Sequence, residues 1–360
     1  MSTRAEDVTP LPRGDRSGAA AEGEPLLQVR DLSVRFRTED GQLSAVDGVT
    51  FDAHGGELLA VVGESGCGKS VTAMALSGLL PPTAKVTGSV RLGGVELVGA
   101  APATLRAARG REIAYIFQEP MTSLNPVFTV GRQISEVLRV HEGMGKREAL
   151  DRAGDLLALV GIPSPRERLR QYPHQLSGGM RQRVMIAMSV ACNPRVLVAD
   201  EPTTALDVTV QAGILDVLRD LRDRLGAAVL LITHDLGVVA DAADRVMVMY
   251  AGRVVERGEV HEFFAHPRHQ YSVGLLGAVP AARVHGTRQR LREIPGLVPV
   301  LAEQPDACTF ADRCPAADDL CRTQRPPLER APHSAHEAAC WHPATDASAS
   351  AGNVSSGERR

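Results

Sequence analysis

Short, continuous runs of apolar residues form the strongest pattern along this chain. Residues 58–62, 113–117, 196–199 and 228–232 are each almost wholly apolar. Runs of this length are typical of strands that are buried on both faces of a parallel sheet. Between them, apolar residues recur at helical spacing, most clearly over about 128–170. Strands that alternate with helices predict an α/β fold, with a parallel sheet between layers of helices.

The ends of these elements are marked in the sequence as well. A helix is expected from about Lys69 to Leu79, because Pro81-Pro82 must stop it. Residues 245–256 contain two strand-like runs around an Ala-Gly pair and predict a hairpin. Past about residue 262 the sequence changes to short, proline-rich pieces that carry cysteines. We therefore predict a domain boundary near residue 262.

Composition narrows the function classes. The 360 residues can form one large domain and a smaller one, with 44% apolar residues for a core. A net charge of −3 and an aromatic content of 3% give no argument for nucleic-acid binding. The longest apolar runs have about six residues, far below the roughly 20 of a membrane-spanning helix. Residues 1–24 lack a signal-like apolar stretch; they and residues 344–360 are expected to be disordered. A cytosolic protein is expected.

One loop has the complete phosphate-binding pattern G-x-x-x-x-G-K-S. It follows the first buried run and opens the next helix, so glycine N–H groups and a helix N-terminus can converge on phosphate oxygens. Lys69 can neutralise the β- and γ-phosphates, and the Ser70 hydroxyl can ligate Mg²⁺. Cys67 is interpreted as a tolerated loop residue without redox chemistry. The predicted nucleotide-binding residues are Gly63, Glu64, Ser65, Gly66, Cys67, Gly68, Lys69, Ser70 and Val71.

Polar residues follow three other buried runs. Asp200 and Glu201 end one run, at the sheet edge where ligands bind in such folds. Asp200 is suited to orient Mg²⁺ through water, and Glu201 to polarise an attacking water. His234 would contact the γ-phosphate or hold that water, and Gln118 would sense the γ-phosphate and Mg²⁺. Alone, either His234 or Gln118 would be taken as structural; their place in an ordered set favours a catalytic role.

The segment Leu176-Ser177-Gly178-Gly179-Met180 indicates a nucleotide closed between two protein subunits. In order, the phosphate loop, Gln118, this segment, the acidic strand end, Ala205-Leu206-Asp207 and His234 resemble the nucleotide-binding subunit of ABC transporters, over about 27–342. The resemblance implies a RecA-like P-loop ATPase core at 25–262 and a helical signature subdomain at about 119–190. It also implies an N-terminal antiparallel β region and a small cysteine-containing C-terminal extension at 263–343.

The same resemblance implies that each active site is shared between two chains. Ser177, Gly178 and Gly179, flanked by Leu176 and Met180, would reach the ATP that the partner's phosphate loop holds. Asp207 would lie in the dimer loop. Phe36 would stack on adenine, although an ordinary strand residue is the alternative. Met180 departs from the general family, which usually has Gln or Glu there, and it offers no strong hydrogen bond.

Three longer segments narrow the resemblance to the ATPases of oligopeptide and dipeptide importers. They are the Ser-Gly-Gly-Met segment from Ser177, residues 118–126 and residues 266–272. The resemblance implies an ATPase paired with a paralogous ATPase as a heterodimer, two transmembrane permeases that are contacted near 119–128, and an extracytoplasmic peptide-binding protein. The chain would sit peripherally at the cytoplasmic face of the plasma membrane. The alternatives are an importer for nickel or another small solute, and a soluble ABC ATPase that acts on nucleic acid or ribosomes.

Four of the six cysteines lie near the C-terminus, separated by five, six and eighteen residues: Cys308, Cys314, Cys321 and Cys340. Such thiols can hold Zn²⁺ or an iron–sulfur cluster, or remain free, and no C-x₂-C pair supports an ordinary zinc finger. The resemblance to peptide-importer ATPases implies a [4Fe–4S] cluster that pins the C-terminal segment. His333, His336 and His342 are interpreted as bystanders rather than zinc ligands. An iron–sulfur redox protein is a further alternative, but it would leave the ATP residues without a role.

Overall fold

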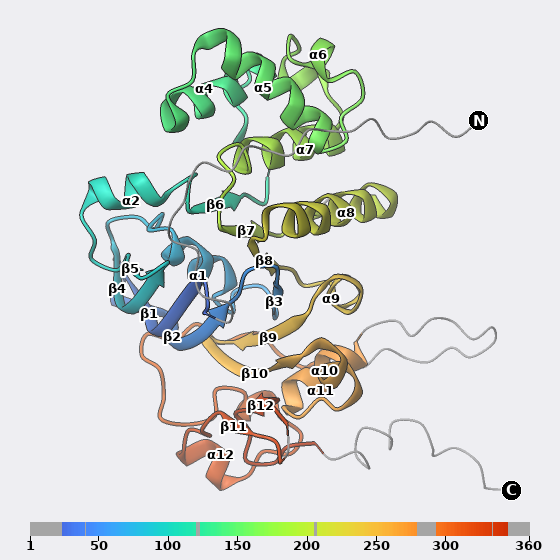
Figure 1. Cartoon of the computed structure of the whole chain (residues 1–360). Helices are drawn as coiled ribbons and strands as arrows, with labels where there is room; N and C mark the ends of the chain where they lie inside the picture. The colour runs from blue at the N-terminus through green and yellow to red at the C-terminus, as the bar shows by residue number, and fades with distance from the viewer. Residues whose placement is uncertain are drawn as a thin grey trace, which may run out of the picture.

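The computed structural model describes residues 24–39, 41–119, 123–204, 207–278, 293–332 and 334–344. Two sheets organise this part of the chain (Figure 1). The smaller is antiparallel, in the order β2-β1-β4-β5. Its strands are β1 (Leu27–Thr38), β2 (Gly41–Ala53), β4 (Ala84–Leu92) and β5 (Val95–Glu96). The predicted N-terminal antiparallel region is therefore confirmed.

The larger sheet is mixed and has the order β11-β12-β10-β9-β3-β8-β7-β6. Neighbours from β9 to β6 pair in parallel, and β10, β12 and β11 add antiparallel strands at one side. Strands β3, β7 and β8 are buried at every position, which explains their continuous apolar sequences. The strands are β3 (Leu58–Val62), β6 (Ile113–Ile116), β7 (Val196–Asp200), β8 (Ala228–Ile232), β9 (Arg245–Tyr250), β10 (Arg253–Glu259), β11 (Glu329–Arg330) and β12 (Glu337–Ala338).

Helices cover the sheets and form a separate upper part (Figure 1). Helix α1 (Lys69–Leu76) ends before the predicted stop, because Gly78 adopts the left-handed φ of +63° just after it. The upper part contains α4 (Val130–Glu142), α5 (Lys146–Leu159), α6 (Pro165–Arg168) and α7 (Gly178–Ser189). The other helices are α2 (Pro102–Ala108), α8 (Val208–Leu225), α9 (Leu236–Ala242), α10 (Val260–Ala265), α11 (Gln270–Gly277) and α12 (Asp319–Thr323), with 3₁₀ turns η1 (Pro173–Gln175) and η2 (Ala311–Arg313).

The C-terminal extension packs onto the cassette rather than standing apart from it. The predicted boundary near residue 262 falls inside α10, and β12 pairs with β10 of the main sheet. Buried Glu256 of β10 accepts hydrogen bonds from the backbone N–H groups of Arg268 (2.7 Å) and His269 (2.8 Å). Its carboxylate also lies 2.7 Å from Nε2 of His336, which is 1% exposed. The extension is thus fixed to the sheet through a buried polar cluster.

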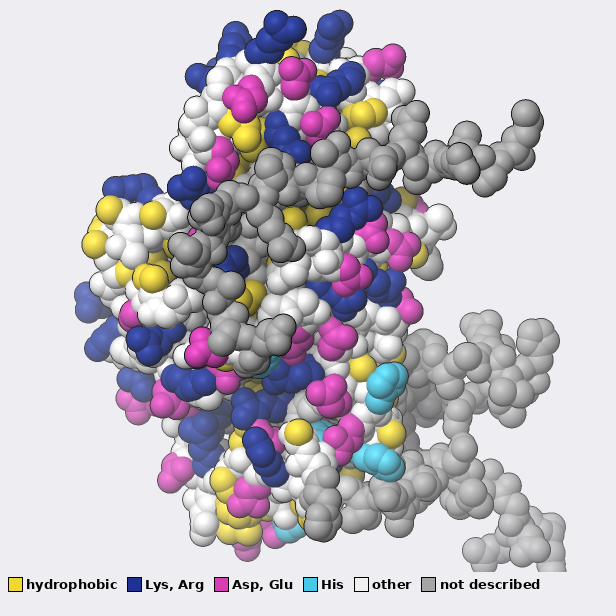
Figure 2. All heavy atoms as spheres, in the orientation of Figure 1, with side chains coloured by type: hydrophobic (Ala, Val, Ile, Leu, Met, Phe, Trp, Pro, Cys, Tyr) yellow, Lys and Arg dark blue, Asp and Glu magenta, His cyan; other side chains and the backbone are white. Residues whose placement is uncertain are grey.

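Within the described residues, no helix is both long and apolar enough to cross a membrane. Figure 2 shows Lys and Arg side chains interspersed with Asp and Glu over the visible face, without one large field of a single sign. This distribution agrees with the net charge of −3.

Candidate functional site

The phosphate-binding loop is shaped by glycines that no other residue can replace. Gly63 and Gly68 have positive φ angles of 151° and 99°. A Cβ at Gly63 would lie 2.3 Å from the carbonyl oxygen of Met249, and one at Gly68 would lie 2.5 Å from that of Ala45. By contrast, a Cβ at Gly66 would meet nothing within 4 Å. The loop is therefore pressed against β9 and β2 on one side and open on the other, as a phosphate cradle requires.

Lys69 lies inside this loop. Its side chain is nearly buried, and Nζ donates to the carbonyl oxygens of Gly63 (2.8 Å) and Glu64 (3.0 Å). No side chain caps the N-terminus of α1, so its first N–H groups are left for an anion. Burial raises the pKa of the Cys67 thiol, which keeps it protonated and supports the interpretation of an inert loop residue. These residues fit the triphosphate of ATP.

Asp200 stands at the carboxyl end of β7, beside the start of α1. Its Oδ1 accepts from the hydroxyl of Ser70 at 3.0 Å, and its Oδ2 from that of Tyr115 at 2.6 Å. Burial raises the pKa of Asp200, and the two hydroxyl hydrogen bonds oppose that shift. A carboxylate and a hydroxyl at the mouth of a phosphate loop are suitable ligands for Mg²⁺. Tyr115 was not foreseen, because an aromatic inside an apolar strand carries no sequence signal for this contact.

Glu201 is the centre of a second polar group. Its Oε2 accepts from Nε2 of Gln118 (3.0 Å) and from the hydroxyl of Thr204 (2.9 Å), and its Oε1 lies 3.4 Å from Nδ1 of His234. Glu201 itself adopts a left-handed φ of 46°, a strained conformation that is typical of functional sites. The structure thus brings Gln118, Glu201 and His234 together.

The signature segment lies elsewhere in the molecule. Ser177 caps α7 by accepting a hydrogen bond from the N–H of Met180 at 3.3 Å. Ser177 and Gly178 are exposed, whereas the Met180 side chain is partly buried against the large hydrophobic core that the upper helices share with the main sheet. In Figure 1, α7 lies with α4 and α5, and α1 lies lower, beside the antiparallel sheet. The signature and the phosphate loop of one chain are therefore apart.

Two further predicted site residues are Asp207 and Phe36. The side chain of Asp207 caps α8 by accepting from the N–H of Val210 at 3.0 Å, while Ala205 and Leu206 lie outside the described residues. Phe36 is half-buried in β1 and packs in the same hydrophobic cluster as Val71 of α1. Its contact with adenine stays a prediction.

The four C-terminal cysteines lie in one region. The N–H of Cys308 donates to the carbonyl of Cys321 at 2.9 Å. Burial, aided by the neighbouring thiols, raises the pKa of Cys308 to about 11, and burial likewise raises the pKa values of Cys314, Cys321 and Cys340. Neutral thiols of this kind must lose their protons before they can bind a metal.

A different set of potential metal ligands lies close together. Atoms of Asp318, Cys321 and His342 all lie within 4.8 Å of one another. His342 therefore lies beside Cys321 and is a potential ligand there, in contrast to its interpretation as a bystander. His336 is a bystander to the thiols, since its partner is Glu256, and His333 lies outside the described residues.

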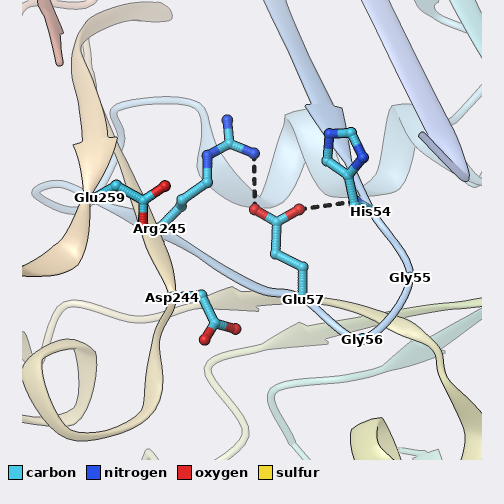
Figure 3. Close-up of a pocket in the computed structure, with 7 residues that line it drawn as sticks. All are labelled: His54, Gly55, Gly56, Glu57, Asp244, Arg245 and Glu259. Atoms are coloured by element: carbon cyan, nitrogen blue, oxygen red, sulfur yellow. Dashed lines mark hydrogen bonds and ion pairs between the residues drawn. The ribbon is translucent and has the colours of Figure 1, made fainter. Parts of the chain in front are cut away.

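A surface hollow lies at the edge of the main sheet opposite the phosphate loop (Figure 3). It lies at the amino ends of β3 and β9, where Glu57 pairs with Nη1 of Arg245 at 2.7 Å and accepts from the N–H of His54 at 2.8 Å. The phosphate loop leaves the carboxyl end of β3, so this hollow is separate from the nucleotide site.

Comparisons with known proteins agree with this geometry. A family model described as "ABC transporter" matches residues 46–204, and one described as "Oligopeptide/dipeptide transporter, C-terminal region" matches residues 255–321. A "Probable peptide ABC transporter ATP-binding protein" of Sinorhizobium fredii is 53% identical over 88% of this chain and 94% of its own length. The "Oligopeptide transport ATP-binding protein OppD" of Salmonella typhimurium is 49% identical over 84% of this chain and 90% of its own.

Similarity to solved structures supports the same family for the ATP-binding cassette. The ATP-binding cassette MJ0796, a dimer in a post-hydrolysis state with ADP and phosphate, superposes with a TM-score of 0.59 and 26% identity. It covers 65% of this chain and 98% of its own. Its extent corresponds to the cassette rather than to the whole chain. On the evidence of its site, its fold and these relatives, the chain belongs to the family of ABC transporter ATP-binding proteins.

Proposed function

We propose that this chain is the ATP-hydrolysing subunit of a bacterial ABC importer of oligopeptides or dipeptides. The observation that carries the proposal is the meeting of Lys69, Asp200, Glu201 and His234 at one edge of the main sheet. The peptide specificity is supported by the names of the relatives and by the match of residues 255–321 to the C-terminal region of oligopeptide/dipeptide transporters.

The residues at the sheet edge divide the chemistry among them. Lys69 and the N-terminus of α1 bind and orient the β- and γ-phosphates. Ser70, Asp200 and Gln118 are placed to hold Mg²⁺, which would neutralise phosphate charge when bound. Glu201 takes a proton from the attacking water, and His234 orients that water or the γ-phosphate. Gln118 contacts Glu201 directly, so closure at the γ-phosphate and activation of the base are linked.

The second half of each site comes from another chain in this proposal. The exposed Ser177 hydroxyl and the N-terminal glycines of α7 would form an anion site for the partner's ATP, since α7 lies apart from α1 and this chain's own phosphate loop. The partner would be a paralogous ATPase, so that a heterodimer closes on two ATP molecules. Two permeases and an extracytoplasmic peptide-binding protein would complete the importer, with this chain at the cytoplasmic face of the membrane.

A [4Fe–4S] cluster on Cys308, Cys314, Cys321 and Cys340 is part of the proposal, with zinc as the alternative occupant. A cluster would hold together a segment that has little apolar core of its own. Anaerobic purification, followed by iron, sulfide and zinc analysis, distinguishes the two. We expect about four irons and four sulfides per chain in the wild type and their loss in Cys308→Ser. Zinc in place of iron and sulfide would show that zinc is the occupant.

The central test is ATP-driven uptake by the complete importer in proteoliposomes, with labelled peptides and with Ni²⁺. Peptide uptake is expected from the wild type. Glu201→Gln should still bind ATP but lose hydrolysis by at least about 100-fold, because the base is gone and the shape remains. Glu259→Gln, at the hollow on the opposite edge, is the matched control and should hydrolyse normally. Uptake of Ni²⁺ without peptide, or full turnover by Glu201→Gln, would contradict the proposal.

A further inference from the structure

An arginine from the C-terminal extension reaches the phosphate-binding loop. Arg313 belongs to η2, between Cys308 and Cys314, and is separated from Glu64 by 249 residues. Its Nη1 lies 2.6 Å from Oε2 of Glu64, and its Nη2 lies 2.9 Å from Oε1. This is a two-armed contact, the strongest geometry for an arginine–carboxylate pair. Glu64 is the second residue of the phosphate loop, so the extension holds the nucleotide site directly.

The guanidinium is held from both sides. Its Nε donates to the carbonyl of Pro295 at 2.7 Å, and Nη2 also lies 3.3 Å from the carbonyls of Ile294 and Gly296. Nη1 makes a further contact of 3.3 Å with the hydroxyl of Tyr250. The Arg313 side chain is only 6% exposed. A group so fully bonded has one orientation, and it fixes the carboxylate that it meets.

The backbone of Glu64 is fixed from the same region. The N–H of Glu64 donates to the hydroxyl of Tyr271 at 2.8 Å, and Tyr271 is fully buried in α11. The rings of Tyr250, Tyr271 and Phe310 pack together, with centroids 4.8 to 5.3 Å apart. Phe310 directly precedes η2. One aromatic cluster therefore supports both the arginine and the tyrosine that contact Glu64.

These contacts continue to the phosphate-binding lysine. The carbonyl of Glu64 accepts from Nζ of Lys69 at 3.0 Å, so the position of Glu64 sets part of the ammonium's cage. The Glu64 carboxylate is also a negative charge on a loop that must bind a triphosphate. Pairing with Arg313 compensates this charge, which would otherwise repel the anion. Both the hydrogen bonds of Arg313 and its positive charge therefore favour phosphate binding by the loop.

We propose that Arg313, assisted by Tyr271, is a positioning residue of the nucleotide site: it orients Glu64 and compensates its charge, so that the loop binds ATP. The C-terminal extension is then a working part of the ATPase, whether or not its thiols hold a metal. The proposal rests on ATP binding by the phosphate loop and is independent of the transported solute.

The test measures the dissociation constant of ATP for the purified full-length chain, together with its melting temperature. Arg313→Gln should weaken ATP binding by about tenfold, because the loop loses its clamp and the Glu64 carboxylate is left unpaired. Adding Glu64→Gln to that variant should restore at least half of the lost binding free energy, because the unpaired charge is removed. Rescue of this kind is not expected for a purely structural role.

The matched control is Arg257→Gln. Arg257 of β10 also joins the extension to the cassette, since it pairs with Glu337 and donates to the carbonyl of Thr50 at 2.6 Å, but these contacts do not include the phosphate loop. It should lower the melting temperature while leaving ATP affinity within about twofold of the wild type. Tyr271→Phe keeps the buried ring, removes only the acceptor for Glu64, and should weaken ATP binding about threefold.

Wild-type ATP affinity in Arg313→Gln, or equal losses in Arg313→Gln and Arg257→Gln, would overturn the proposal. If Arg313→Gln does not fold, Tyr271→Phe decides the matter, and unchanged affinity in that variant would overturn it as well. Failure of the wild type to bind ATP would overturn the proposed function together with this one. Wild-type binding with no response to either variant would overturn the positioning role alone.

Discussion

Replacing Gly179 by alanine tests how tightly the signature helix is packed. Gly179 lies in the first turn of α7, and a Cβ there would be 2.5 Å from Cγ1 of Val210 in α8. Ordinary van der Waals contact begins at 3.4 Å. Val210 is β-branched and has few alternative rotamers, so α7 and α8 must separate by roughly 1 Å. The substitution should therefore disturb both helix ends at once.

The expected cost follows from overpacking in a confined position. Inserting one methyl group against a rigid neighbour should destabilise the chain by about 1–3 kcal/mol. The strain should also reach Asp207, because its carboxylate accepts from the N–H of Val210 at 3.0 Å. ATP hydrolysis by the assembled importer should fall as well, since the signature segment and the Asp207 loop are both predicted to lie at the nucleotide interface.

Urea denaturation of the purified chain measures this cost, with Gly145→Ala as the matched control. Gly145 precedes α5 with a φ of −63°, and a Cβ there would meet nothing within 4 Å. Alanine at that position should change the free energy of unfolding by no more than about 1 kcal/mol, because the lower entropy of the unfolded chain is offset by the weaker N-cap. The control carries the same chemical change without the contact.

The decisive comparison is a double-mutant cycle with Val210→Ala. Removing the two Val210 methyl groups should make room for the new Cβ, so the double variant should be more stable than the sum of the single changes by about 1 kcal/mol or more. Additive effects, or a Gly179→Ala chain as stable as the wild type, would refute the reasoning.

Two other predictions concern pH and the metal site. Burial lowers the pKa of His269 to about 4, although Glu256 opposes this shift, so the folded chain holds a neutral imidazole while the unfolded chain binds a proton below about 6.5. The neutral imidazole contributes at most about 3 kcal/mol to the free energy of unfolding; this contribution is complete above pH 6.5 and is lost as pH falls towards 4. The free energy of unfolding of His269→Asn, measured in urea, should therefore depend less on pH in that window than that of the wild type. An equal pH dependence of the two proteins would contradict this. Tyr115→Phe removes a hydrogen bond to Asp200 and should raise the Mg²⁺ concentration for half-maximal ATP hydrolysis about tenfold; an unchanged Mg²⁺ requirement would exclude this orienting role.

The buried strands and the ligand-binding loops were predictable because each is encoded locally. Strands β3, β7 and β8 are buried at every position and, apart from Asp200 at the end of β7, apolar, and a parallel sheet brings their carboxyl ends to one edge. The meeting of Asp200 and Glu201 with the phosphate loop follows from that topology. The comparisons confirmed the resemblance to ABC transporter ATPases. That resemblance rested on short segments with fixed spacing, which are also encoded locally.

The contacts of the extension were not predictable from such patterns. Arg313 and Glu64 are separated by 249 residues, and neither lies in a periodic segment that fixes its partner. His336 stands in a short polar stretch, and only the pairing of β12 with β10 brings it to Glu256. Tyr115 likewise lies in an ordinary strand sequence. Long-range side-chain pairs of this kind depend on the packing of whole elements, which the sequence encodes only collectively.

The pairing of β12 with β10 has a practical consequence for any shortened version of this protein. A chain that ended after α10 would expose the hydrogen-bonding groups along the outer side of β10, a ready template for association with a second molecule. It would also strip Glu256 of Arg268, His269 and His336, and leave a bare carboxylate in an apolar setting. A cassette that is shortened at its apparent end should therefore aggregate, because β10 needs the C-terminal extension to cover its outer side.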